Sequence, residues 1–126
     1  MAKILIIDDE VYISTIIQEI LGDRGHEVFC EGDGFAGLKF LEQSPRPDLL
    51  MVDLSLPRMS GCEFIEKVNA DPKLKGIPVI LLTGYNPSVN DFPPGVSYQD
   101  IITKPFDLDD LVTRVEKLID TKKITV

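Results

Sequence analysis

Short apolar runs of the kind that form β-strands alternate with segments of helical periodicity along almost the whole chain. Three of these runs are continuously apolar, which is typical of parallel strands covered by helices on both faces of a sheet. Two others are shorter or more polar, and therefore suit the edges of the sheet. The expected strands are 3–7, 27–30, 49–52, 77–82 and 98–102.

The segments between the strands carry apolar residues three and four positions apart, the spacing of one face of an α-helix. Asp33 stands where a side chain caps the second helix, and Ser60 with Glu63 forms a capping box for the third. The fourth crossover is rich in proline, which leaves room for about one or two helical turns near 88–92. The apolar helix faces lie within 13–21, 35–41, 64–68 and 108–119.

Strands and helices in alternation imply right-handed βαβ units and a parallel sheet with helices on both faces. For five strands, the expected α/β fold is the doubly wound, flavodoxin-like sheet with strand order 2-1-3-4-5. A chain of 126 residues is long enough for one such domain. Ligands of this architecture bind at the carboxyl ends of the strands, so a site is expected where the strands end.

The charge of the chain argues against several classes of partner. Its 21 acidic and 13 basic residues give a net charge of −8, which disfavours binding to nucleic acid or to an anionic membrane surface. No apolar stretch approaches the ~20 residues of a transmembrane helix, and the amino terminus does not have the form of a signal peptide. Cys30 and Cys62 form no metal-binding motif; we expect reduced, buried thiols and a cytoplasmic location.

Polar residues follow four of the expected strands and should meet at one edge of the sheet. Carboxylates from two adjacent strands suit an octahedral cation such as Mg²⁺ or Mn²⁺ better than zinc. Two carboxylates ~5 Å apart repel by roughly 3 kcal/mol at an effective dielectric constant of 20, so a cation or the lysine must offset the repulsion. The residues concerned are Asp8, Asp9, Glu10, Asp53, Thr83 and Lys104.

Asp53 is a candidate nucleophile, because a carboxylate is ionised at neutral pH and attacks phosphorus without a general base. The metal ion, the Lys104 ammonium and the Thr83 hydroxyl could contact separate oxygens of a phosphoryl group. These residue types therefore point to phosphoryl transfer onto Asp53.

Each of these residues also has an ordinary structural interpretation. Asp9 and Glu10 could complement the dipole at the start of the first helix, as Asp107 is expected to do for the last. Thr83 alone would be a strand-end hydroxyl, and Lys104 alone a solvated charge. Their joint occurrence at four strand ends favours a functional site.

Four motifs in order give this chain a close resemblance to the receiver domain of two-component response regulators, with its CheY-like fold, over essentially the whole length. The resemblance implies that Asp53 is the phospho-acceptor. It also implies that Mg²⁺ (or Mn²⁺) is held by Asp8, Asp9, Asp53 and the backbone carbonyl of Ser55. The motifs are ILIIDDE at 4–10, LLMVDLSLPRMSG at 49–61, VILLTG at 79–84 and TKPF at 103–106.

The resemblance further implies that Thr83 and Lys104 sense the phosphoryl group. Ile101 stands at the switch position, where the family usually carries an aromatic residue. The implied donor is a phosphohistidine of a histidine kinase or of a phosphotransfer protein in a phosphorelay. We expect a regulatory domain rather than an enzyme, with the receiver at 1–121, a short tail at 122–126, no output domain, and a signal that leaves by contact with a protein partner.

Two alternatives stay open at this stage. Gly32, Gly34 and Gly37 form a GxGxxG motif between an expected strand and helix, with Asp53 at about the spacing of a ribose-binding acid, so the chain could be a dinucleotide-binding module. It could also be a receiver from a hybrid kinase or a longer regulator. A hydrolase of the haloacid dehalogenase type is disfavoured, because the run that starts at Asp53 lacks a second acid two positions later.

Overall fold

Five parallel strands form the centre of the computed structural model, which describes residues 2–84 and 92–123. Their order in the sheet is β2-β1-β3-β4-β5, as the sequence predicted. Because all of the strands run in the same direction, their carboxyl ends lie at one edge of the sheet. The strands are β1 (Lys3–Ile7), β2 (Glu27–Glu31), β3 (Leu49–Asp53), β4 (Val79–Thr83) and β5 (Asp100–Thr103).

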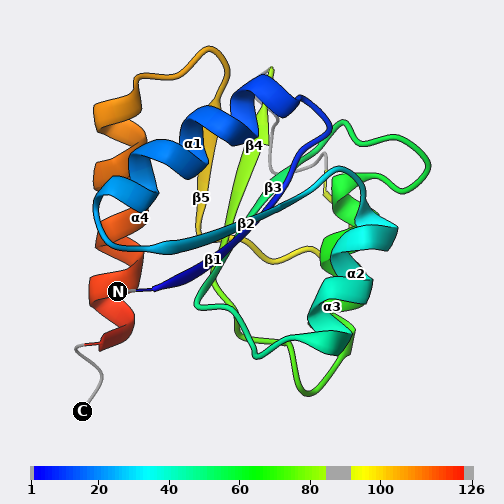
Figure 1. Ribbon diagram of the computed structural model, residues 1–126. Helices are drawn as coiled ribbons and strands as arrows, with labels where there is room; N and C mark the ends of the chain where they lie inside the picture. Colours follow the sequence, from blue (N-terminus) through cyan, green and yellow to red (C-terminus); the bar gives the residue numbers. More distant parts are fainter. Residues whose placement is uncertain (1, 85–91, 124–126) are drawn as a thin grey trace.

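Helices cover both faces of the sheet, with α1 and α4 on one face and α2 and α3 on the other (Figure 1). Asp33 caps α2 by accepting the backbone N–H of Ala36, as predicted, and Ser60 caps α3 by accepting that of Glu63, which is one of the two hydrogen bonds of the predicted capping box. Asp107 accepts the backbone N–H of residue 110 at the start of α4. The helices are α1 (Val11–Asp23), α2 (Gly34–Gln43), α3 (Gly61–Ala70) and α4 (Leu108–Lys123).

The sheet divides the apolar interior into two cores. Ile4 and Ile6 of β1 pack into the core on the side of α1 and α4, whereas Leu5 and Ile7 pack into the core beneath α2 and α3. All five residues of β3 are buried, which explains why its first four residues form a continuous apolar run before Asp53. None of the helices in the described part of the chain combines the length and apolar character that a membrane crossing requires.

Some local predictions differ from the structure. Strand β4 begins at Val79 rather than at Ile77, because Pro78 has no N–H to donate and the N–H of Ile77 bonds to the carbonyl of Leu74 in a turn. Strand β5 begins at Asp100, two residues later than expected. The predicted helical turns at 88–92 lie almost wholly outside the described residues.

The two cysteines also differ from their prediction in one respect. Cys30 and Cys62 are both free thiols, as expected, but they are half-buried rather than buried. Burial nevertheless raises the pKa of both thiols above the ordinary value of a cysteine. Both are therefore mainly protonated at neutral pH.

Gly61, at the start of α3, lies against the backbone of the strand end that carries Asp53. A Cβ atom at this position would overlap the carbonyl oxygen of Asp53 and lie 2.8 Å from the Cα of Leu54. Since these are backbone atoms, relief requires a shift of the helix or of the strand. We expect Gly61→Ala to lower the free energy of unfolding by about 2 kcal/mol, measured by urea denaturation.

Gly22→Ala is the matched control for this prediction, because a Cβ at Gly22 in α1 meets no atom within 4 Å. The gain in helix propensity should leave this variant as stable as the wild type or more stable by up to about 1 kcal/mol. If Gly61→Ala were as stable as the wild type, the close approach of Gly61 to the backbone of Asp53 and Leu54 would not contribute to stability.

Candidate functional site

The carboxyl ends of the strands bring the predicted polar residues to one place. Asp53 is the last residue of β3 and Thr83 the last of β4, while Asp8 follows β1 and Lys104 follows β5. Asp8, Asp53 and Thr83 are all buried. The backbone N–H of Lys104 donates to the carbonyl of Thr83 at 2.6 Å, and the bond from Lys104 to Pro105 is a cis peptide.

The ammonium of Lys104 lies among three carboxylates. Its Nζ donates to Asp8 Oδ2 at 3.0 Å, to Asp53 Oδ2 at 2.9 Å and to Glu10 Oε1 at 2.6 Å. Burial by itself lowers the pKa of this ammonium, but the hydrogen bonds to the three carboxylates outweigh that effect and raise the pKa above the ordinary value of a lysine. Lys104 is therefore a permanent positive charge at the site.

The remaining oxygens of the two buried carboxylates accept backbone hydrogen bonds. Asp8 Oδ1 accepts the N–H of Glu10 at 2.8 Å, and Asp53 Oδ1 accepts the N–H of Ser55 at 2.9 Å. Burial raises the pKa of the Asp8 carboxyl above its ordinary value, against opposing contributions from the Glu10 N–H and from Lys104. The hydrogen bonds to the Asp8 and Asp53 carboxylates thus fix the backbone that follows β1 and β3.

One oxygen each from Asp8, Glu10 and Asp53 lies within 4.8 Å of the others. Hard carboxylate oxygens at this spacing fit a small divalent cation such as Mg²⁺. Asp9 is exposed and borders the same cleft, together with Ser55, but it is not a member of this cluster. The structure therefore brings Glu10, rather than Asp9, into contact with the predicted site residues.

Glu10 was interpreted from the sequence as a partner of the helix dipole. It occupies the N-cap position of α1, but its side chain makes no capping hydrogen bond and reaches Lys104 instead. The available sequence signal was three consecutive acids after a strand, since Asp8 and Glu10, two positions apart, can face the same side. The run of three acids did not by itself indicate whether Glu10 or Asp9 would contact Lys104.

Ile101 lies on β5 opposite Leu81 of β4. Its side chain is half-buried and packs against the core on the side of α2 and α3. The position that the family resemblance implies for the switch thus carries an aliphatic side chain that is already partly inside the protein.

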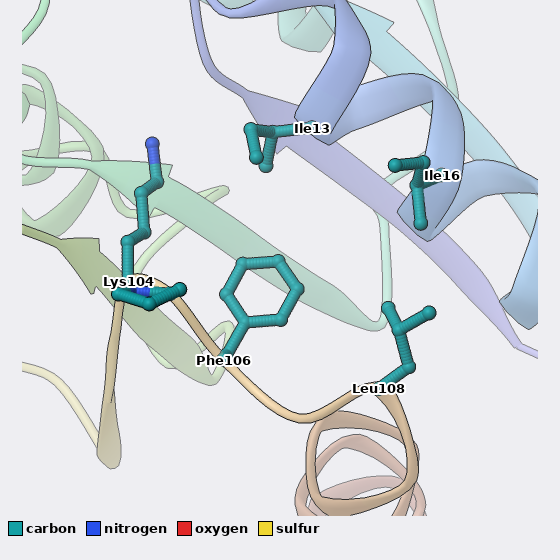
Figure 2. A pocket seen from close by; sticks show the side chains of 6 residues that line it. Ile13, Ile16, Lys104, Phe106 and Leu108 are labelled. Carbon is teal, nitrogen blue, oxygen red and sulfur yellow. The ribbon is translucent and has the colours of Figure 1, made fainter.

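An apolar groove adjoins the site (Figure 2). Ile13 and Ile16 of α1 face Phe106 and Leu108, and Lys104 lies along one side of the groove. Figure 2 shows the nitrogen of Lys104 directed away from the Phe106 ring. The lysine stem therefore lies beside apolar groups, while its charge lies among the carboxylates.

Two of the three glycines of the GxGxxG motif, Gly34 and Gly37, have a packing role, whereas a Cβ at Gly32 would meet no atom within 4 Å. A Cβ at Gly34 would lie 2.6 Å from Sδ of Met59, and one at Gly37 would lie 2.6 Å from Cδ1 of Ile7. The start of α2 already has a carboxylate, because Asp33 caps it. The motif thus allows α2 to lie close to the sheet and to the loop before α3.

The fold and the acidic site together define a regulatory signalling domain built around a phospho-acceptor. The family model of the response regulator receiver domain matches residues 4–116, and the chain belongs to this family. The dinucleotide-binding alternative has no support from this match.

Two curated relatives and one solved structure illustrate the similarity. The DNA-binding dual master transcriptional regulator RpaA of Synechocystis is 34% identical over 122 residues, which cover 94% of this chain and 49% of RpaA. Response regulator Rcp1 of the same organism is 39% identical over 88 residues, covering 64% of this chain and 60% of Rcp1. The chemotaxis response regulator CheY4 of Vibrio cholerae superposes with a TM-score of 0.85 at 29% identity, covering 94% of this chain and 98% of that one.

Proposed function

We propose that this receiver domain accepts a phosphoryl group on Asp53 and passes the signal on by contact with another protein. The observation that carries the proposal is the Asp53 carboxylate, which lies at a strand end with Lys104 Nζ 2.9 Å from one of its oxygens. Such a carboxylate is an anionic nucleophile with a fixed cation beside it. Family membership supports the same assignment.

The transfer needs little covalent chemistry from the protein. An oxygen of Asp53 attacks phosphorus, the bond from phosphorus to the donor atom breaks, and the donor keeps that electron pair. Lys104 and the hydroxyl of Thr83 then donate hydrogen bonds to phosphoryl oxygens. Asp53 Oδ1 stays oriented by the N–H of Ser55.

For the metal, we propose Asp8, Asp9, Asp53 and the backbone carbonyl of Ser55 as the groups that hold Mg²⁺ or Mn²⁺. The oxygen-only donor set and the position of Asp9 and Ser55 at the border of the same cleft support this proposal. When bound, the cation would neutralise negative charge on the phosphoryl oxygens. Asp8 then serves to bind the ion, while its backbone contacts keep the β1 loop in place.

The donor is proposed to be the phosphohistidine of a histidine kinase or of a phosphotransfer protein. The one histidine of the chain, His26, is engaged elsewhere: its Nδ1 accepts the N–H of Ala2, and its Nε2 lies 3.1 Å from Glu116. Free Cys30 and Cys62 suit action in the reducing cytoplasm. The net charge of −8 disfavours direct contact of this domain with nucleic acid or an anionic membrane.

Removal of the divalent cation tests the proposed chemistry. The protein is incubated with a small acyl phosphate and Mg²⁺, and its intact mass is measured over time. We expect one added phosphoryl group per chain with Mg²⁺, and only background addition when EDTA is present. Equal labelling with and without EDTA would count against the proposed cation site.

A further inference from the structure

Glu10 is the charged residue at the site to which the proposed chemistry gives no role. It contacts Lys104 at 2.6 Å, the shortest of the three contacts made by the ammonium. Its side chain is 57% exposed, whereas those of Asp8 and Asp53 are 0% and 6% exposed. Glu10 therefore holds the ammonium from the solvent side of the cleft.

The two buried partners of Lys104 are also the groups that the proposed function requires for other purposes. Asp8 Oδ2 and Asp53 Oδ2 both accept from the ammonium, yet both residues belong to the proposed cation site, and Asp53 is the proposed nucleophile. When these oxygens are engaged elsewhere, the ammonium loses its buried partners. Glu10 is not among the proposed metal ligands, so it can still pair with Lys104 when the cation is bound.

We propose that Glu10 is a positioning residue for Lys104, which keeps the ammonium beside Asp53 while Asp8 and Asp53 exchange it for a divalent cation. This inference rests on the proposed function. The apolar groove supports it, because Figure 2 places the lysine stem beside Phe106 and directs the nitrogen away from that ring. The carboxylates are then the groups available to hold the charge.

Two other roles for Glu10 give different results in experiment. If Glu10 binds the cation directly, its replacement weakens binding whether or not Lys104 is present. If it acts only through its charge, Glu10→Asp binds Mg²⁺ as the wild type does, because aspartate keeps the charge, although it has a shorter reach and can cap α1. A positioning role requires both the length of the glutamate and the presence of the lysine.

The first part of the experiment measures thermal unfolding in metal-free buffer, with Glu10→Gln made in the wild type and in Lys104→Met. We expect the substitution to lower Tm by about 2–4 °C in the wild type, because an ion pair to a largely buried lysine is lost. In the Lys104→Met background, we expect no loss. An equal loss in both backgrounds assigns Glu10 to the helix dipole and overturns the proposal.

The second part titrates Mg²⁺ into the wild type, Glu10→Asp, Lys104→Met and the double variant by calorimetry. We expect Glu10→Asp to weaken Mg²⁺ binding roughly threefold or more when Lys104 is present, and to leave it within a factor of about two when methionine replaces the lysine. If Glu10→Asp weakens Mg²⁺ binding equally in both backgrounds, Glu10 is a metal ligand and the proposal is overturned. If Glu10→Asp binds Mg²⁺ with wild-type affinity, the proposal is also overturned.

Failure of this proposal is distinguishable from failure of the proposed function. Wild-type protein that binds no Mg²⁺ and takes up no phosphoryl group overturns the proposed function, and the positioning role with it. Wild-type protein that does both, with no dependence of the Glu10 effects on Lys104, overturns the positioning role alone.

Discussion

Replacement of Asp53 by asparagine is expected to abolish phosphoryl addition from an acyl phosphate in the presence of Mg²⁺. Asparagine has nearly the same shape, but its amide is neutral and is not a nucleophile toward phosphorus. It also removes one of the three carboxylates of the cluster, which should weaken cation binding. Intact-mass measurement on the wild type and on Asp53→Asn, with circular dichroism to show that both are folded, checks this prediction.

Asp33→Asn is a suitable control for that experiment. Asparagine caps helices as well as aspartate does, so the variant should retain the start of α2, and it loses the charge together with the ion pair to Arg58. We expect it to gain a phosphoryl group as the wild type does. An adduct on Asp53→Asn would show that another residue accepts the phosphoryl group, and loss in both variants would point to a general effect of charge.

Lys104→Met is expected to destabilise the metal-free protein by about 3 kcal/mol. The substitution leaves buried Asp8 and Asp53 and the nearby Glu10 within 4.8 Å of one another, without the ammonium that offsets their repulsion. Mg²⁺ should restore more stability to this variant than it adds to the wild type, because the cation no longer competes with the lysine. Urea denaturation with EDTA and with Mg²⁺ measures both effects.

The matched control is Lys39→Met, which removes an exposed lysine from α2. Loss of this charge should change the stability little, and its response to Mg²⁺ should equal that of the wild type. If Lys104→Met behaves like this control, the ammonium does not balance the acidic cluster.

The strands were predictable from the sequence where burial on both faces dictates the pattern. In β1 and β3 every position near the centre faces one of two cores, so a run of apolar residues defines the strand. The start of β4 was predicted two residues too early, because Ile77 is buried without being in the strand. Burial alone does not reveal whether a backbone N–H bonds to a neighbouring strand or to a turn.

The site was predictable to the extent that it depends on strand ends. Asp53, Thr83 and Lys104 follow directly from the positions of three parallel strands. Which of the two residues, Asp9 or Glu10, contacts Lys104 was not predictable, because it depends on how the chain turns between β1 and α1. That turn is set by the hydrogen bond from the Glu10 N–H to Asp8, and no periodic pattern encodes such a contact.

The division of the interior by the sheet has a consequence for protein engineering. Since successive residues of β1 point into different cores, each layer of helices can be redesigned against its own set of strand side chains. A library that varies the contacts of α2 and α3 would keep Ile4 and Ile6 constant, and one that varies α1 and α4 would keep Leu5 and Ile7. New recognition surfaces can thus be selected on one flank while the opposite flank retains its native packing.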